Sequence, residues 1–182
     1  MLLAALIRRF VLPFLLLVFA FTAQAADDRV IFDQSLGDFS EELIEAKDQG
    51  KKGILLFFEM DECPFCHRMK TTVLNQPDVM SYFKKNFLIF AVDIEGDVEI
   101  ADFKGQTMTM KKFALTHNRV RATPVFAFFD LSGNRIVRYT GPTSGVEEFM
   151  WLGEFVVKEH YKNQRFTKYK RQKRKEKKNN KG

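Results

Sequence analysis

Apolar and polar positions follow two different patterns along the chain. Nearly continuous apolar runs occupy residues 54–58, 87–92 and 125–129. Each run is short enough for a strand, and unbroken apolar character is typical of strands buried on both faces. A further short strand is expected at residues 136–139. It follows Leu131-Ser132-Gly133-Asn134, which has the composition of a hairpin turn.

Between these runs the apolar residues recur at helical spacing. The first expected helix begins with Asp38 or Ser40 as its cap and stops at Gly50. The polar residues 95–106 are expected to form a loop or a poorly formed element. The order is helix, strand, helix, strand, helix, strand, strand, helix. It predicts an α/β fold with a central mixed four-stranded sheet flanked by helices. The expected helices span residues 38–49, 64–75, 77–83, 107–117 and 144–161.

The first 25 residues have the features of a signal peptide. Arg8 and Arg9 precede an apolar stretch at residues 10–21, and Ala23-Gln24-Ala25 fits the small-residue cleavage rule. We therefore expect cleavage after Ala25 and export into an oxidising compartment, where a disulfide can persist; that this compartment is the periplasm is implied by the family resemblance given below. The alternative is an uncleaved membrane anchor, but the apolar stretch is shorter than the roughly 20 residues of a membrane span.

The C-terminal 21 residues differ from the rest of the chain in charge. Residues 162–182 contain eleven Lys and Arg against one acid, Glu176, which gives +10 in a chain whose net charge is +6. With two arginines near the N-terminus, residues 26–161 carry −6. We therefore expect one domain at 26–161 and a disordered basic tail at 162–182. Such a tail is by default a solvated end, and the functional alternative is contact with an anionic membrane or an acidic partner. Export argues against nucleic acid as its target.

The only two cysteines lie in Cys63-Pro64-Phe65-Cys66, between an expected strand and an expected helix. Pro64 suits the first helical position, which places Cys63 at the helix N-terminus. Unpaired N–H groups and the helix dipole favour a negative thiolate there, the form that attacks sulfur. Cys66 follows three residues later on the same helical face. The spacing predicts a disulfide that opens and closes.

Other interpretations of the motif are weaker. A purely structural disulfide closing so small a loop would stabilise the fold by only about 2 kcal/mol. With His67 the motif also matches C-x-x-C-H, the c-type haem attachment sequence, but a buried strand before it and Pro64 at a helix start speak against haem. Zinc held by Cys63, Cys66 and His67 lacks an evident fourth ligand. We therefore expect neither a bound cofactor nor a metal.

Two distant motifs carry a resemblance to the thioredoxin superfamily: the C-x-x-C after the first core strand and Thr123-Pro124 before the third. More narrowly, residues 38–161 are similar to exported thioredoxin-like proteins of the sulfur-oxidation (SoxW-like) type. The resemblance implies a thioredoxin fold and thiol–disulfide oxidoreductase activity, with Cys63 attacking and Cys66 resolving. It also implies a cis-proline at Pro124, beside which the backbone of Thr123 pairs with a protein disulfide substrate.

The chain departs from the thioredoxin pattern at one position. Thioredoxins proper carry a buried acid where this chain has Phe57, and Glu59, two residues later on the same strand face, is the candidate for proton transfer. Glu59, Asp61 and Glu62 place negative charge around the site, which would raise the pKa of the attacking thiol. This favours a reductase or isomerase over a strong oxidant. A membrane or envelope electron donor is then expected. A different kind of function is also open: a redox-inert binding module that holds an extended peptide beside Thr123 and Pro124.

Overall fold

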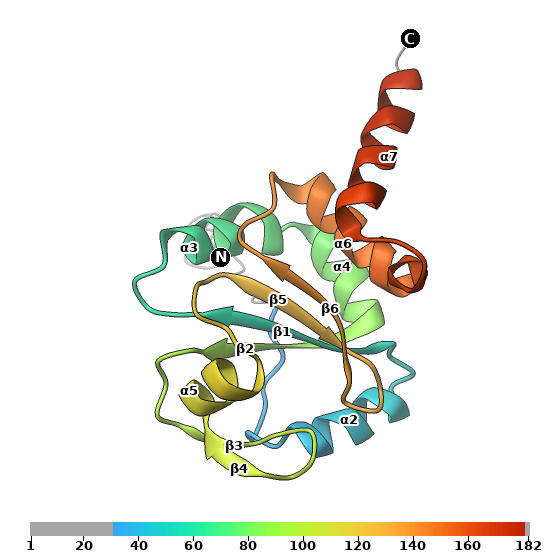
Figure 1. The fold of residues 1–182 in the computed structure, drawn as a ribbon. Coiled ribbons are helices and arrows are strands. Elements are labelled where there is room, and N and C mark those ends of the chain that lie inside the picture. Colours follow the sequence, from blue (N-terminus) through green and yellow to red (C-terminus); the bar gives the residue numbers. More distant parts are fainter. Residues whose placement is uncertain (1–30, 181–182) are drawn as a thin grey trace, which may run out of the picture.

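A computed structural model of the chain describes residues 31–180, so the predicted signal peptide lies outside the described residues. Its centre is a four-stranded sheet in the order β2-β1-β5-β6 (Figure 1). Strand β1 runs parallel to β2 and antiparallel to β5, and β5 runs antiparallel to β6. This is the mixed sheet that the sequence predicted. Its strands are β1 (Gly53–Glu59), β2 (Phe87–Asp93), β5 (Val125–Phe129) and β6 (Arg135–Thr140).

Two layers of helices and a hairpin cover the sheet, one layer on each face. One face packs against α3 (Pro64–Met69), the π-helical segment η1 (Lys70–Leu74), α4 (Pro77–Asn86) and α6 (Val146–Val157). The other face packs against α2 (Phe39–Asp48), the β3–β4 hairpin (Glu99–Ala101 and Thr107–Thr109), α5 (Met110–Lys112) and the π-helical η2 (Phe113–His117). A 3-10 turn η3 (His160–Lys162) and helix α7 (Phe166–Asn179) complete the described chain.

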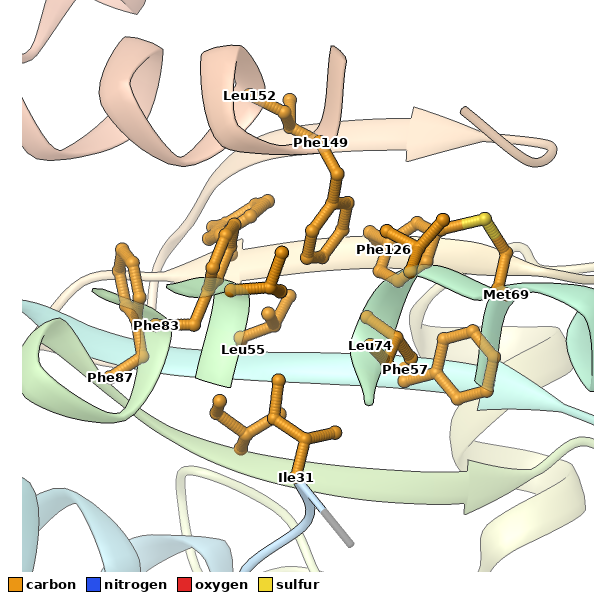
Figure 2. Close-up of a cluster of buried hydrophobic side chains, with 14 of the residues drawn as sticks. Ile31, Leu55, Phe57, Met69, Leu74, Phe83, Phe87, Phe126, Phe149 and Leu152 are labelled. Atoms are coloured by element: carbon orange, nitrogen blue, oxygen red, sulfur yellow. The ribbon is translucent and has the colours of Figure 1, made fainter. Parts of the chain in front are cut away.

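Strand β1 supplies both layers of the core, as its unbroken apolar sequence requires. Leu55 and Phe57 face the α3–α6 layer, whereas Leu56 and Phe58 face the α2 layer, because successive side chains of a strand alternate between faces. All four are at most 1% exposed. Figure 2 shows the first layer, in which Phe149 points from α6 towards the sheet.

Helices α4 and α6 approach each other closely. The Phe83 ring of α4 stacks on Phe149 of α6 with centroids 4.4 Å apart. A Cβ added to Gly153 of α6 would lie 2.7 Å from the Phe83 ring, so a side chain at position 153 would push the helices apart. The second layer begins as expected, with the Asp38 carboxylate accepting the Ser40 N–H at 2.8 Å to cap α2.

The expected helix at residues 107–117 is wrong in its first turn. Residues 107–109 form strand β4, in which Met108 pairs with Ile100 of β3. Both side chains are buried on the same side of the hairpin, where Met108 is 6% exposed. Pairing with a segment that the sequence had suggested was a loop satisfies the backbone there, and only residues from Met110 onwards are helical.

The expected disorder of the basic tail is also wrong. Residues 166–179 form helix α7, which lies against α6 (Figure 1). Tyr169 is 5% exposed, and its ring centroid lies 5.4 Å from that of Phe155. Acidic side chains of α6 pair with the lysines and arginine of α7 that face them. Burial of Tyr169 and neutralised charge together offset the self-repulsion on which the expectation of disorder rested.

Between residues 31 and 180, every helix is too short or too polar to cross a lipid bilayer.

Candidate functional site

The cysteine pair lies between the end of β1 and the first turns of α3. Cys63 is the N-cap of α3, with extended backbone angles (φ −121°, ψ 92°), and Pro64 occupies the first turn. The Cys66 N–H donates a hydrogen bond to Cys63 Sγ over 3.1 Å. The sulfur therefore takes the place of the side-chain oxygen that usually caps a helix, in contact with a free N–H of the first turn.

The structure joins Cys63 and Cys66 in a disulfide, with Cα atoms 5.2 Å apart. The two sulfurs predicted to react with each other are thus brought together. Cys63 is 6% exposed and Cys66 only 1%, and both belong to the apolar cluster of the α3–α6 layer that includes Phe57 and Met69. An attacking molecule can reach Cys63 more readily than Cys66.

Thr123 and Pro124 lie next to the disulfide although 60 residues separate Thr123 from Cys63 in sequence. The antiparallel pairing of β1 with β5 explains this, because it places the start of β5 at the sheet edge where β1 ends. The Thr123–Pro124 peptide bond is cis. The Thr123 hydroxyl donates to Cys63 Sγ over 3.2 Å, so Cys63 accepts two hydrogen bonds.

The acidic residues around the site differ in how their charge is balanced. Glu59, at the end of β1, is 19% exposed and forms an ion pair with Lys70 of η1 at 2.6 Å. Phe57 is completely buried at the position where a thioredoxin proper would carry its acid. Asp61 and Glu62 are exposed, so water screens their charge. The negative charge close to the sulfurs is thus smaller than a count of acids suggests.

The geometry does not suit the haem and zinc alternatives. Thioether attachment of a haem needs two sulfurs beside an open surface, whereas Cys63 and Cys66 are only 6% and 1% exposed. His67 is exposed on α3, as expected of a surface helix residue. Within residues 31–180 there is no cluster of three or more His, Cys, Asp or Glu side chains placed to bind a metal ion.

Sequence reasoning missed two features of the site. Phe65 is 53% exposed between the cysteines, with the Arg68 guanidinium 5.4 Å from its ring centroid. Helical spacing was a usable signal, because residue 65 must point outward when residues 63 and 66 point inward. The second feature is Lys70 as the partner of Glu59, which spacing alone did not reveal because the contact joins a strand to a helical segment.

Comparison with known proteins agrees with this architecture. A family model of the thioredoxin-like domain matches residues 39–156, well over half of the chain. A search of curated proteins returns no match.

Solved structures similar to this one share its fold. A thioredoxin-fold protein from Helicobacter pylori is 22% identical, covers 80% of this chain and 89% of its own, and gives a TM-score of 0.59. A thioredoxin from Thermus thermophilus is 23% identical, with coverage of 68% and 88% and a TM-score of 0.52. The DsbH oxidoreductase is 17% identical, with coverage of 76% and 92% and a TM-score of 0.55. The fold is thus the predicted thioredoxin fold, and the chain belongs to the thioredoxin-like domain family.

Proposed function

We propose that this protein is a thiol–disulfide oxidoreductase of the cell envelope that reduces or isomerises protein disulfides. The observation that carries the proposal is a disulfide at a helix N-terminus, with the Thr123 hydroxyl from the start of β5 donating to the sulfur of Cys63. A purely structural disulfide would not need these neighbouring groups. Membership of the thioredoxin-like family supports the same chemistry.

The proposed cycle starts from the reduced pair. The Cys63 thiolate attacks one sulfur of a substrate disulfide, forms a mixed disulfide and releases the first substrate thiolate, which takes up a proton. Cys66 then loses its proton, and its thiolate attacks Cys63 Sγ and releases the second substrate thiolate, which also takes up a proton. The substrate has gained two electrons and two protons, and the Cys63–Cys66 bond has formed. A dithiol donor restores the reduced pair by the reverse exchange.

The polar neighbours of Cys63 give it the first role. Its sulfur accepts the Cys66 N–H and the Thr123 hydroxyl, and both hydrogen bonds would stabilise a thiolate more than a thiol. Cys66, at 1% exposure, is suited to react only with a sulfur already brought next to it. Attack by Cys63 and resolution by Cys66 follow from this difference.

Thr123 and Pro124 would bind the substrate. Thr123 precedes β5 and is partly exposed, so an extended peptide beside Cys63 can pair with its backbone as an added strand. Phe65, exposed between the two cysteines in sequence, would supply apolar contact to the same peptide.

We propose that Glu59 exchanges a proton with Cys66 during the cycle. Its carboxylate is held in place by an ion pair with Lys70. Replacing it with Gln should slow insulin reduction about tenfold without changing the thermal midpoint by more than a few degrees. An unchanged rate would remove Glu59 from the mechanism.

We further propose export by residues 1–25, a periplasmic location, the SoxW-like type and an electron donor in the membrane or envelope. The sequence features at the N-terminus and the family resemblance support these assignments. A reduction potential near about −270 mV, as in thioredoxin, would fit the proposed reductase direction, whereas one near about −120 mV would reverse it.

A pair of serine variants tests the central proposal. Cys63→Ser should abolish the reduction of insulin by a dithiol. Cys66→Ser should also stop turnover but accumulate a mixed disulfide with the substrate, because the attack still occurs and its resolution does not. The two variants lose the same disulfide, so each controls for its structural effect. Equal turnover by Cys63→Ser and wild type would overturn the proposal, and no turnover by the wild-type protein would overturn it in favour of a redox-inert binding module.

A further inference from the structure

Helix α7 divides its basic residues into two sets. Lys170, Lys173, Arg174 and Lys177 face α6 and pair with its acids. The second set consists of exposed cations, which we call the α7 stripe: Lys168, Arg171, Lys175 and Lys178.

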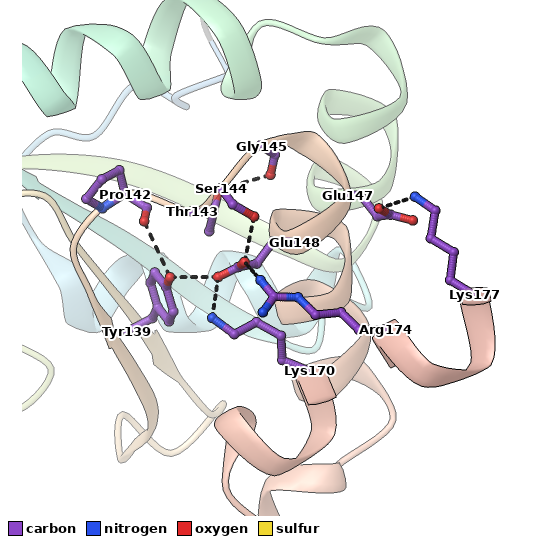
Figure 3. A network of polar contacts seen from close by, with 10 residues as sticks. All are labelled: Tyr139, Pro142, Thr143, Ser144, Gly145, Glu147, Glu148, Lys170, Arg174 and Lys177. Atoms are coloured by element: carbon purple, nitrogen blue, oxygen red, sulfur yellow. Dashed lines mark hydrogen bonds and ion pairs between the residues drawn. The ribbon is translucent and has the colours of Figure 1, made fainter. Parts of the chain in front are cut away.

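The paired set fixes the orientation of α7. Glu148 of α6, at 3% exposure, accepts from Lys170 at 2.7 Å and from Arg174 at 3.2 Å (Figure 3). Lys173 pairs with Glu154 at 2.9 Å. Since Glu148 is buried, removing either cation from it would leave charge poorly balanced in the interior. The helix is therefore held in one rotation about its axis. Lys168, Arg171 and Lys175 of the other set face away from the domain, and Lys178 lies at the rim of a cavity beside Arg174 and Lys177.

The α7 stripe is a continuous row of like charge. Its members follow one another at intervals of three, four and three residues, so they lie on one face of the helix. None of them pairs with an acid in the described part of the chain. Like charges at this spacing destabilise an isolated helix. The anchoring of the opposite face keeps them aligned.

The apolar side chains of α7 point the other way. The ring centroids of Phe166 and Tyr169 each lie 5.4 Å from that of Phe155 in α6. The stripe itself carries no aromatic or aliphatic residue that could insert into another molecule. Any partner of this face is therefore bound by charge at a surface and not by burial of apolar groups.

We propose that the α7 stripe docks on an anionic phospholipid surface. A bilayer presents dense negative charge in a plane, which a straight row of cations on a helix projecting from the domain matches without a shaped pocket (Figure 1). Residues 26–161 carry −6 and residues 162–182 carry +10, so the domain and its C-terminal segment have opposite charge and the molecule approaches such a surface with α7 first. The proposal does not depend on the chemistry at Cys63.

Two variants with equal net charge test this. In the stripe variant, Lys168, Arg171, Lys175 and Lys178 become Gln. In the control variant, four exposed lysines on the α2 side of the domain become Gln: Lys47, Lys52, Lys104 and Lys111. Both are made in the full chain, so residues 1–30 contribute equally to each. Binding is measured to phosphatidylcholine vesicles with and without phosphatidylglycerol.

We expect wild-type protein to bind only the vesicles with phosphatidylglycerol and to be released by high salt. A cation near such a surface contributes about fivefold in affinity, so the stripe variant should lose about 100-fold or more, and the control variant less than about tenfold. Equal losses would show that net charge alone acts, and would overturn the proposal. Equal wild-type binding to both vesicles, or binding to neither, would overturn it as well. Insulin reduction in solution should be the same for all three proteins, which separates this test from that of the proposed function.

Discussion

The redox site and the α6–α7 junction both place a polar atom in the interior, but they balance it differently. Cys63 Sγ accepts two hydrogen bonds, one from a backbone N–H and one from Thr123. The carboxylate of Glu148 accepts four, which together form what we call the Glu148 cluster. Its members are Tyr139, Ser144, Glu148, Lys170 and Arg174.

The difference reflects what each atom has to do. A buried carboxylate is stable only when its charge is fully paired, so the Glu148 cluster fixes one arrangement of α6 and α7. Burial opposes ionisation of Glu148, but hydrogen bonds from Lys170, Ser144 and Tyr139 outweigh it and lower the pKa of the carboxyl. A sulfur that must exist both as a thiolate and in a bond needs partners that tolerate both states, and two weak donors meet that requirement.

The largest effect is expected when the Glu148 carboxylate is removed, which tests whether the α6–α7 junction depends on a fully paired charge. Glu148→Ala should lower the free energy of unfolding by about 3 kcal/mol, because two cations and a tyrosine hydroxyl lose their buried partner. Glu147→Ala is the matched control: Glu147 pairs with Lys177 but is half exposed, and its loss should amount to less than about 1 kcal/mol. Urea unfolding measures both. Insulin reduction should be retained by each folded variant, and equal stability losses would contradict the distinction between the two pairs.

Low pH should destabilise the contact between α6 and α7, because it protonates the carboxylates that hold the two helices together. Burial raises the pKa of Glu154, but hydrogen bonds from Lys158, Lys173 and Tyr169 outweigh it and lower the pKa to about 2. A lowered pKa in the folded state means that stability is fully present above the ordinary value of 4.5 and falls away as the pH drops towards 2. Thermal midpoints at pH 5 and pH 2.5 should differ less in Glu154→Gln than in wild type. Glu95→Gln, at an exposed position, should keep the wild-type difference.

The smallest expected effect is at the redox site itself. Thr123→Val removes one donor from Cys63 and should slow alkylation of reduced Cys63 by iodoacetamide at neutral pH about tenfold, since a hydrogen bond to a charged group contributes about 1.5 kcal/mol. Mass spectrometry measures the rate. Thr71→Val is the control, because the Thr71 hydroxyl bonds only to helix carbonyls at His67 and Arg68. Equal rates in both variants would show that the hydroxyl does not stabilise the thiolate.

The main elements of the fold could be predicted because their signals are local. The apolar runs of β1, β2 and β5 match their observed bounds within about two residues, and α2 begins after the expected cap, Asp38. The position of the cysteines at the N-terminus of α3 followed from Pro64 and from the strand before it. Strand β4 was mistaken for a helix because Met108, Met110 and Phe113 fit a helical period as well as a hairpin.

The sequence by itself determined the order of the four sheet strands and of the main helices between them, the pairing of the two cysteines within one helical turn, and a proline at the start of β5. These depend on residues a few positions apart, whose geometry the backbone sets. Only the tertiary structure decided that α7 is ordered, that Glu148 anchors it, and that Glu59 pairs with Lys70. Those outcomes depend on which distant groups lose water together, and the desolvation of a charge is defined only once its partner has been brought beside it.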